Sequence, residues 1–178
     1  MTFWQKMKGR TQSPPMVSFA EMGWSWLGSF FGMAAIAFLH YRFIDQHSLT
    51  LLIGSFGASA VLVYGAVRSP LAQPRNLVGG HILSAFVGVA ACQWFGSSLW
   101  LAAAIAVSTS IALMHLTKTL HPPGGATALI AVIGGDSIHR LGYFYVLMPT
   151  ALGAGIILVT ALIFNNMIKS RRYPEFWV

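Results

Sequence analysis

The sequence predicts an all-α, polytopic membrane protein with about six transmembrane segments. We expect these to form two inverted three-segment repeats, in which the second segment of each repeat is a broken or half helix. Composition carries the membrane assignment: of 178 residues, 56% are hydrophobic and only 8% are charged, whereas a soluble domain carries about 25% charged residues. The distribution of apolar runs and a repeated Gly-Ala pattern predict the number of segments and the repeat.

The polar residues 1–21 come first, and we expect them to form a cytoplasmic segment. Six apolar runs follow, at about 22–39, 49–67, 77–96, 99–117, 122–134 and 142–166. A helix needs about 20 apolar residues to cross a bilayer. Run 49–67 is interrupted by Gly54 and Gly57, and run 122–134 is short, so either is a candidate half helix. A single transmembrane domain over 22–167 and a cytoplasmic tail over 168–178 are therefore predicted.

Basic residues indicate how many runs cross the membrane. If all six cross and the N-terminus is cytoplasmic, only Arg42 and Arg140 of the 11 Lys and Arg residues lie outside. If the two Gly-rich runs re-enter instead, Arg68, Arg75 and Lys118 also lie outside, and the asymmetry nearly vanishes. Because cytoplasmic loops carry an excess of Lys and Arg, the charges favour six crossings with both termini in the cytoplasm.

An internal repeat supports the same count. GASAVL at 57–62 and GATALI at 125–130 match at a constant offset of 68 residues. The repeats would then cover about 22–96 and 97–167, with three crossings each. Because an odd number of crossings inverts the second copy, the two broken helices would meet head to head near the membrane midplane, where transporters bind substrate.

The stretch LTKTLHPPGGATALIAVIGG at 116–135 is the strongest candidate for a site. Broken backbone at membrane depth is costly unless it lines a cavity, and a helix that begins there presents free N–H groups and a positive dipole end to an anion. The alternative is that its small residues only permit tight helix packing. With the converging helix start near Ser55, the candidate substrate-binding residues are Ser55, Phe56, Gly57, Ala58, Ser59, His121, Pro122, Pro123, Gly124, Gly125, Ala126 and Thr127.

Other basic and polar residues near these helix starts form a candidate vestibule, namely Arg68, Arg75, Asn76, His81 and Lys118. Arg75 and Asn76 either concentrate anions at a mouth or belong to a rigid turn, and Lys118 is either a topology charge or part of the vestibule. His81 is an intramembrane histidine and therefore a candidate site residue. His121 either donates to an anion or hydrogen-bonds a freed carbonyl.

The sequence lacks the residues that several classes of function require. The four acidic residues, Glu21, Asp45, Asp136 and Glu175, lie in predicted loops or tails, so no carboxylate is available within a span. No catalytic motif or cofactor loop occurs, and His115 has no acidic or Cys partner for a metal site. The basic residues are scattered rather than clustered, which argues against nucleic acid. We expect no enzyme activity, cofactor or metal.

Three blocks of the chain resemble the HPP family of integral membrane proteins: LHPPGGATAL at 120–129, GSFGASAVLVYG at 54–65 and SPLAQPRNLVGGH at 69–81. The resemblance extends from about residue 22 to 167. That family is usually described with four transmembrane helices, so six crossings depart from the description. Its members are associated with nitrite transport across cyanobacterial and plastid membranes. The resemblance therefore implies nitrite, while the residues themselves indicate only a small monovalent anion.

The resulting prediction is a multi-pass channel or carrier for a small monovalent anion, in a bacterial-type inner (plasma) membrane or a plastid-type membrane. Its partners would be the anion and the lipid bilayer, with a homodimer as the expected assembly. Two alternatives remain: a non-transporting scaffold or accessory subunit, and a membrane enzyme that uses His115, His121 and His139. Anion selectivity, proton coupling and direction of flux are left open by the sequence.

Overall fold

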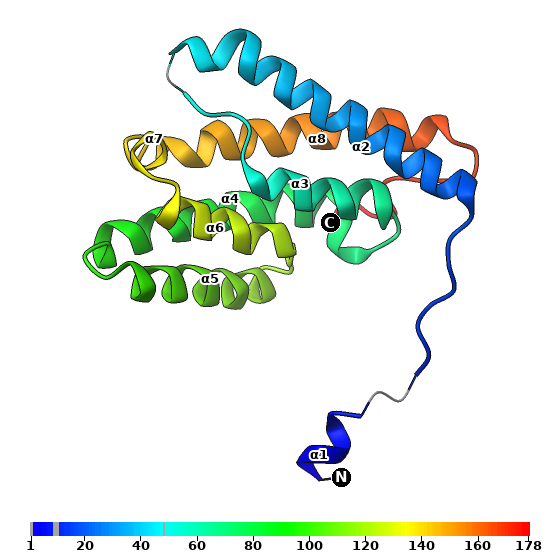
Figure 1. The fold of residues 1–178 in the computed structure, drawn as a ribbon, viewed down its shortest axis with the longest axis horizontal. Helices are drawn as coiled ribbons and strands as arrows, with labels where there is room; N and C mark the ends of the chain where they lie inside the picture. The colour runs from blue at the N-terminus through cyan, green and yellow to red at the C-terminus, as the bar shows by residue number, and fades with distance from the viewer. Residues whose placement is uncertain (1, 9–10, 48) are drawn as a thin grey trace.

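The computed structural model describes residues 2–8, 11–47 and 49–178, and every regular element in these ranges is helical (Figure 1). The α-helices are α1 (Phe3–Lys6), α2 (Phe19–Leu39), α3 (Gly54–Ala60), α4 (Pro74–Phe95), α5 (Leu99–Leu116), α6 (Pro122–Ile133), α7 (Asp136–His139) and α8 (Leu152–Met167). π-helical turns extend α2 over His40–Ile44 and α3 over Val61–Gly65, and precede α8 over Val146–Ala151. Short 3-10 turns cover Asp45–His47 and Pro70–Ala72.

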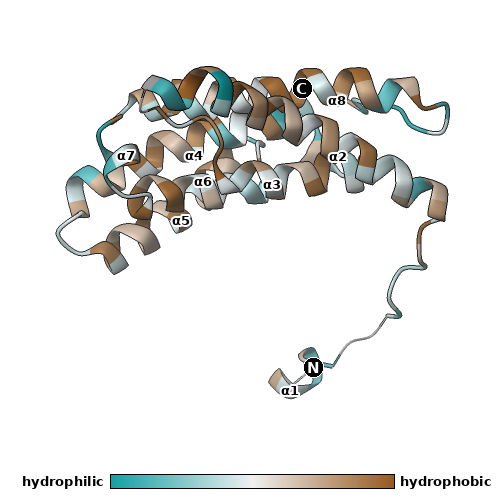
Figure 2. Ribbon diagram, turned by 45° about the horizontal axis from the view of Figure 1, so that its top comes forward, coloured by the Kyte–Doolittle hydropathy of each residue, from teal (hydrophilic) through white to brown (hydrophobic). Residues whose placement is uncertain are grey.

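Four helical segments are long and apolar enough to cross a membrane: Phe19–Ile44, Pro74–Phe95, Leu99–Leu116 and Val146–Met167. Two shorter apolar helices, Gly54–Gly65 and Pro122–Ile133, coincide with the two runs predicted to be broken. Hydrophobic residues dominate the helices (Figure 2). The all-helical membrane class is thus confirmed, while crossing by the short helices and the inverted repeat remain predictions.

The helices form two groups with α3 between them (Figure 1). In one group, α4 packs against α5 and α6, and in the other α2 packs against α8. The short helix α3 contacts α6 on one side and both α2 and α8 on the other. Polar side chains on α3 can therefore meet side chains from the first group inside the protein.

Glycines allow α4 and α6 to lie very close together. A Cβ added at Gly88 would lie 2.8 Å from the Cα atom of Ala128, and one added at Gly124 would lie 2.8 Å from both Gly80 O and Ser84 Oγ. Such close approach through small residues is typical of helix packing in membranes. The contact of Gly124 with Gly80 and Ser84 places the first turn of α6 beside the middle of α4.

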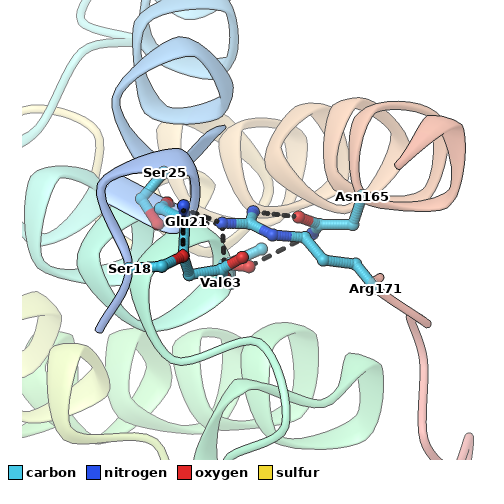
Figure 3. Close-up of polar contacts among 6 residues, drawn as sticks. All are labelled: Ser18, Glu21, Ser25, Val63, Asn165 and Arg171. Carbon is cyan, nitrogen blue, oxygen red and sulfur yellow. Dashed lines mark hydrogen bonds and ion pairs between the residues drawn. The ribbon is translucent and has the colours of Figure 1, made fainter. Parts of the chain in front are cut away.

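A charged cluster joins the start of α2 to the chain that follows α8 (Figure 3). The Arg171 guanidinium donates to the Glu21 carboxylate at 2.7 Å, to Ser25 Oγ at 2.9 Å and to Asn165 Oδ1 at 2.9 Å. Glu21 lies in the first turn of α2, which Ser18 caps by accepting from the Glu21 N–H. The start of α2 and the end of α8 therefore lie at the same end of the bundle, as an even number of crossings requires.

The tail after α8 also fixes the loop before α4. The Tyr173 hydroxyl donates to Ala72 O at 2.8 Å, and the Glu175 N–H donates to Gln73 Oε1 at 2.8 Å. Gln73 Nε2 in turn donates to Val67 O at 3.0 Å. Burial raises the pKa of the Tyr173 phenol, so this side chain is a neutral donor at physiological pH. The loop that carries Leu71 is thereby held against the protein core.

Candidate functional site

The first turns of α3 and α6 lie side by side and point in opposite directions. Ser55, at the start of α3, lies next to Thr127 of α6, whereas Ser59, one turn further along α3, lies next to His121 at the start of α6. From this overlap α3 extends towards the end where α2 begins, and α6 extends towards α7 (Figure 1). The two helix starts therefore converge near the middle of the bundle.

The side chains of α3 divide between two faces. Ser55 and Ser59 share one face because residues four apart on a helix are neighbours, and both are buried. Phe56 is also fully buried, with its ring centroid 5.4 Å from that of His81. Gly57 and Ala58 are exposed, and Gly57 lines a groove shared with α2 residues that include Ser29. Only the serine face takes part in the polar site.

Two prolines define where α6 begins. His121 has an extended backbone, with φ −140° and ψ 105°, and Pro122 and Pro123 occupy the first two helical positions. Proline disfavours helical backbone in the preceding residue and has no N–H to leave unpaired in the first turn. The His-Pro-Pro sequence thus stops the chain from becoming helical before residue 122 and keeps the His121 side chain at the helix start.

His81 of α4 bridges the two short helices. Its Nε2 atom lies 2.7 Å from Ser59 Oγ, and its Nδ1 atom lies 2.7 Å from Thr127 Oγ1. Ser59 and Thr127 are the positions that the internal sequence match aligns at an offset of 68 residues. One imidazole therefore holds the two corresponding hydroxyls.

His121 extends this network towards the loop before α4. Its Nε2 atom lies 2.9 Å from Ser59 Oγ, and its Nδ1 atom lies 2.7 Å from Leu71 O. The His81 and His121 ring centroids are 5.0 Å apart. At the other end, Thr127 Oγ1 lies 2.9 Å from Ser55 Oγ. We call Ser55, Ser59, His81, His121 and Thr127 the hydroxyl–imidazole cluster.

The cluster is sealed in this conformation. Ser59, His81, His121 and Thr127 have no exposed surface, and Ser55 is 1% exposed. No Asp or Glu occurs in α3, α4, α5, α6 or α8, and each cluster side chain is hydrogen-bonded. The cluster is therefore a solvent-inaccessible, polar region in which both helix starts converge on hydroxyl and imidazole groups.

The other predicted binding residues of α6 lie outside the cluster. Gly124 and Pro123 are buried, with Gly124 packed against the α4 backbone. Pro122 is exposed, Ala126 is half-buried, and a Cβ at Gly125 would meet only Val107 of α5, at 3.8 Å. The glycine that α6 needs for close approach is thus Gly124, and Gly125 faces α5 rather than the cluster.

The predicted vestibule residues lie in three places, and three of the five are at the connection between α5 and α6. Arg75 donates to Thr117 O at 2.8 Å and Asn76 donates to Leu120 O at 2.8 Å, so both fix the connection between α5 and α6. Lys118, in that connection, is exposed. Arg68 lines a pocket with Glu21 and the residues after α8, at the end of the bundle where the charged cluster lies. Of this group, His81 alone joins the hydroxyl–imidazole cluster.

Two contributors to the site were not predicted from the sequence. Tyr145, which is fully buried, donates from its hydroxyl to Thr127 O at 3.0 Å, and Leu71 supplies the carbonyl that faces His121. Leu71 lies 50 positions from His121 along the chain, and Tyr145 lies 18 positions from Thr127. A buried Tyr before a Pro-broken helix and a backbone carbonyl in a loop carry no local signal of this role.

The arrangement does not resemble a metal centre or a three-histidine enzyme site. Within the described ranges, no group of three His, Cys, Asp or Glu side chains is placed to hold a metal ion. His139 hydrogen-bonds Val132 O at 2.9 Å, and His115 is exposed on the last turn of α5. The three histidines of the enzyme alternative therefore do not form a common site with one another.

Comparison with known proteins gives one family and two close relatives. The family model described as "HPP, transmembrane region" matches residues 14–174. A transmembrane protein of Dictyostelium discoideum is 49% identical over 98% of this chain and 57% of its own length, and a second from the same organism is 47% identical over 95% of the chain and 60% of its own. No solved structure matches.

The match covers both short helices and the whole hydroxyl–imidazole cluster. The chain spans only 57% and 60% of the lengths of these two relatives. Their names identify them as transmembrane proteins and mention no substrate. The comparisons thus establish the family and the membrane setting, and the activity has to be argued from the site.

Proposed function

We propose that this chain, which belongs to the HPP family of transmembrane proteins, transports a small monovalent anion through the hydroxyl–imidazole cluster. The observation that carries the proposal is the convergence of two helix starts on buried hydroxyl and imidazole groups. Helix N-termini favour negative charge, and paired helix starts near the membrane centre are a recurring way of binding anionic groups in transporters. The absence of Asp and Glu from these helices removes the main source of repulsion.

The buried state of the cluster favours a carrier over an open channel. Because the cluster side chains have essentially no exposed surface, an ion can reach them only if α3 and α6 separate. The chain beside these helices offers places for such a movement, since residues 51–53 ahead of α3 are not helical and Met148 has non-helical φ and ψ ahead of α8. An arriving anion would replace the contacts that the hydroxyls now make with one another.

Nitrite is the substrate that we propose first, on the family resemblance alone. Orientation is proposed from the basic residues: the end of the bundle that carries the Arg171 cluster would face the cytoplasm, with both termini there. The membrane would be a bacterial-type plasma membrane or a plastid-type membrane. A homodimer remains a prediction.

Uptake by proteoliposomes tests the proposal. Purified full-length protein would be reconstituted, and uptake of nitrite, nitrate, formate and chloride would be measured against empty liposomes. We expect uptake of at least one of these anions and its loss in His81→Phe, which removes both ring nitrogens from the cluster. His115→Phe is the matched control because His115 is exposed on α5.

Anion uptake that is the same in both folded variants would contradict the site. Absence of uptake of all four anions by folded wild-type protein would contradict transport of this class. The second outcome would favour the scaffold alternative.

A further inference from the structure

We infer that the hydroxyl–imidazole cluster takes up one proton with each anion, and that Ser59 passes this proton between His81 and His121. The inference rests on the proposed function, and it adds the coupling ion and the residue that conducts it. It follows from the four hydrogen-bond distances within the cluster, from the distance between His121 and Leu71 O, and from which of these atoms can donate.

The proton arrangement of the neutral cluster is determined from one end. Leu71 O can only accept, so the His121 Nδ1 atom at 2.7 Å must carry a hydrogen. In a neutral imidazole the other nitrogen then accepts, so the Ser59 hydroxyl donates to His121 Nε2. Because Ser59 has a single hydrogen, His81 Nε2–H must donate to Ser59 Oγ.

The far side of His81 is fixed in the same way. With its hydrogen on Nε2, neutral His81 accepts at Nδ1 from the Thr127 hydroxyl, so in the neutral cluster Thr127 does not donate to Ser55 Oγ, which lies 2.9 Å away. The donors of the neutral cluster therefore point from Thr127 towards Leu71. This chain of donors has one arrangement, because reversing it would place a lone pair of neutral His121 against Leu71 O.

One additional proton fits the same heavy-atom positions in two ways. With the proton on His81, both its nitrogens donate, and the Thr127 hydroxyl turns to Ser55 Oγ or to Pro123 O, which lies 3.2 Å away. With the proton on His121, both of its nitrogens donate, Ser59 donates to His81 Nε2, and His81 Nδ1–H donates to Thr127.

The two protonated forms interconvert through Ser59. Its oxygen accepts the hydrogen of one imidazole while its own hydrogen moves to the other, so one O–H bond and one N–H bond form and one of each breaks. No heavy atom needs to change its partner. The Ser59 hydroxyl is the only side chain within hydrogen-bond distance of both Nε2 atoms among the contacts of the described residues.

The surroundings leave the added charge without a fixed counter-ion. The titratable groups that face the cluster are His81, His121 and Tyr145, whose hydroxyl is occupied with Thr127 O. Of the other ionisable residues on the helices packed around the cluster, Arg75 of α4 binds Thr117 O, His115 of α5 is exposed, and Glu21 of α2 is paired with Arg171. Cys92 lies near the far end of α4, and the Tyr64 hydroxyl is hydrogen-bonded to Thr160. The bound anion is therefore the partner that stabilises the cluster's proton, and by linkage each favours binding of the other. Anion and proton would cross together with no net charge.

The experiment compares two driving forces in the same proteoliposomes. Nitrite accumulation by full-length protein would be driven either by an inside-alkaline pH gradient with the membrane potential clamped at zero by valinomycin and potassium, or by an inside-positive potential without a pH gradient. Empty liposomes correct for leakage of the uncharged acid. We expect the pH gradient to drive accumulation and the potential to have no effect.

Variants at Ser59 test the relay itself. In Ser59→Ala, pH-driven accumulation should fall about tenfold or more, because a hydrogen bond to a charged imidazolium contributes more free energy than one between neutral groups. Ser59→Thr keeps the hydroxyl and should retain the accumulation. Ser110→Ala is the matched control, since the buried Ser110 hydroxyl on α5 has no partner among the described residues. It should behave as wild type.

The outcomes separate the two proposals. Uptake that follows the membrane potential and ignores the pH gradient would overturn proton coupling while leaving anion transport in place. Undiminished pH-driven accumulation in folded Ser59→Ala would overturn the relay. No uptake by wild type under either driving force would instead contradict the proposed function.

Discussion

The hydroxyl–imidazole cluster and the Arg171 cluster are both polar, but the first is fully buried and built from neutral groups, whereas the second is partly exposed and built around an ion pair. At the centre, hydroxyls and imidazoles from α3, α4 and α6 meet with no carboxylate or guanidinium among them. At the end of the bundle, the Arg171 side chain is committed to Glu21, Ser25 and Asn165 (Figure 3). The first has neutral groups whose protons can reorient, and the second has a fixed ion pair.

This difference indicates separate roles for the two regions. A guanidinium that already has a carboxylate and two further acceptors gains little from a passing anion, and removing Glu21 would leave the buried guanidinium without its counter-ion. Neutral hydroxyls can exchange partners at little cost. Changes at the Arg171 cluster should therefore alter stability, whereas changes at the centre should alter transport.

The largest effect on stability is expected from Arg171→Met. It removes the hydrogen bonds that join the tail to α2 and α8, and we expect the free energy of unfolding to fall by about 3 kcal/mol, the upper end of the range for hydrogen bonds to charged groups. Unfolding of the full chain in detergent would be the measurement. Arg172→Met, at an exposed neighbouring position, should change it by less than about 0.5 kcal/mol. Equal values for the two would refute the structural role.

A smaller loss is expected where α4 and α6 touch. In Gly88→Ala the new methyl group would meet the Ala128 backbone, which cannot rotate away, so we expect a loss of about 1–3 kcal/mol. In Gly155→Ala the methyl group would meet nothing within 4 Å, and the helix propensity of Ala favours it by up to about 1 kcal/mol. Thermal unfolding of both variants would test this packing. A Gly88 variant as stable as the Gly155 variant would show that the helices are further apart.

The smallest effect is expected from Tyr173→Phe, which removes the hydroxyl that donates to Ala72 O. A typical hydrogen bond contributes about 1 kcal/mol, and the carbonyl left behind lies in the loop that positions Leu71. Thermal unfolding beside Tyr143→Phe, at an exposed position, would measure it. No difference between the variants would mean that the tail does not restrain this loop.

The sequence predicts the helices better than it predicts which of their faces meet. Apolar runs and the prolines of His-Pro-Pro placed the start of α6 within one residue of Pro122, because these signals are local. Ser55, Ser59 and Thr127 were selected for the same reason. Whether Gly124 or Gly125 faces α4, however, depends on the rotation of α6, which its neighbours determine.

The sequence does not predict the partners of the cluster, for a similar reason. The distances from His121 to Leu71 O and from Tyr145 to Thr127 O join residues 50 and 18 positions apart, and no local pattern encodes them. The sequence places Arg171 only in the cytoplasmic tail over 168–178, since its Glu21 partner lies 150 residues away in the chain. Charge and periodicity indicate where such residues lie along the membrane normal but not which of them touch.

The central claim is that the anion passes through the hydroxyl–imidazole cluster, and one pair of variants tests it most directly. Thr127→Val and Thr160→Val remove the same hydroxyl, one from the cluster and one from α8, where Thr160 binds the Tyr64 hydroxyl at 2.8 Å. Nitrite uptake by proteoliposomes would be compared at matched protein content. We predict a loss of about tenfold or more for Thr127→Val and near wild-type uptake for Thr160→Val. Equal uptake by the two folded variants would contradict the account.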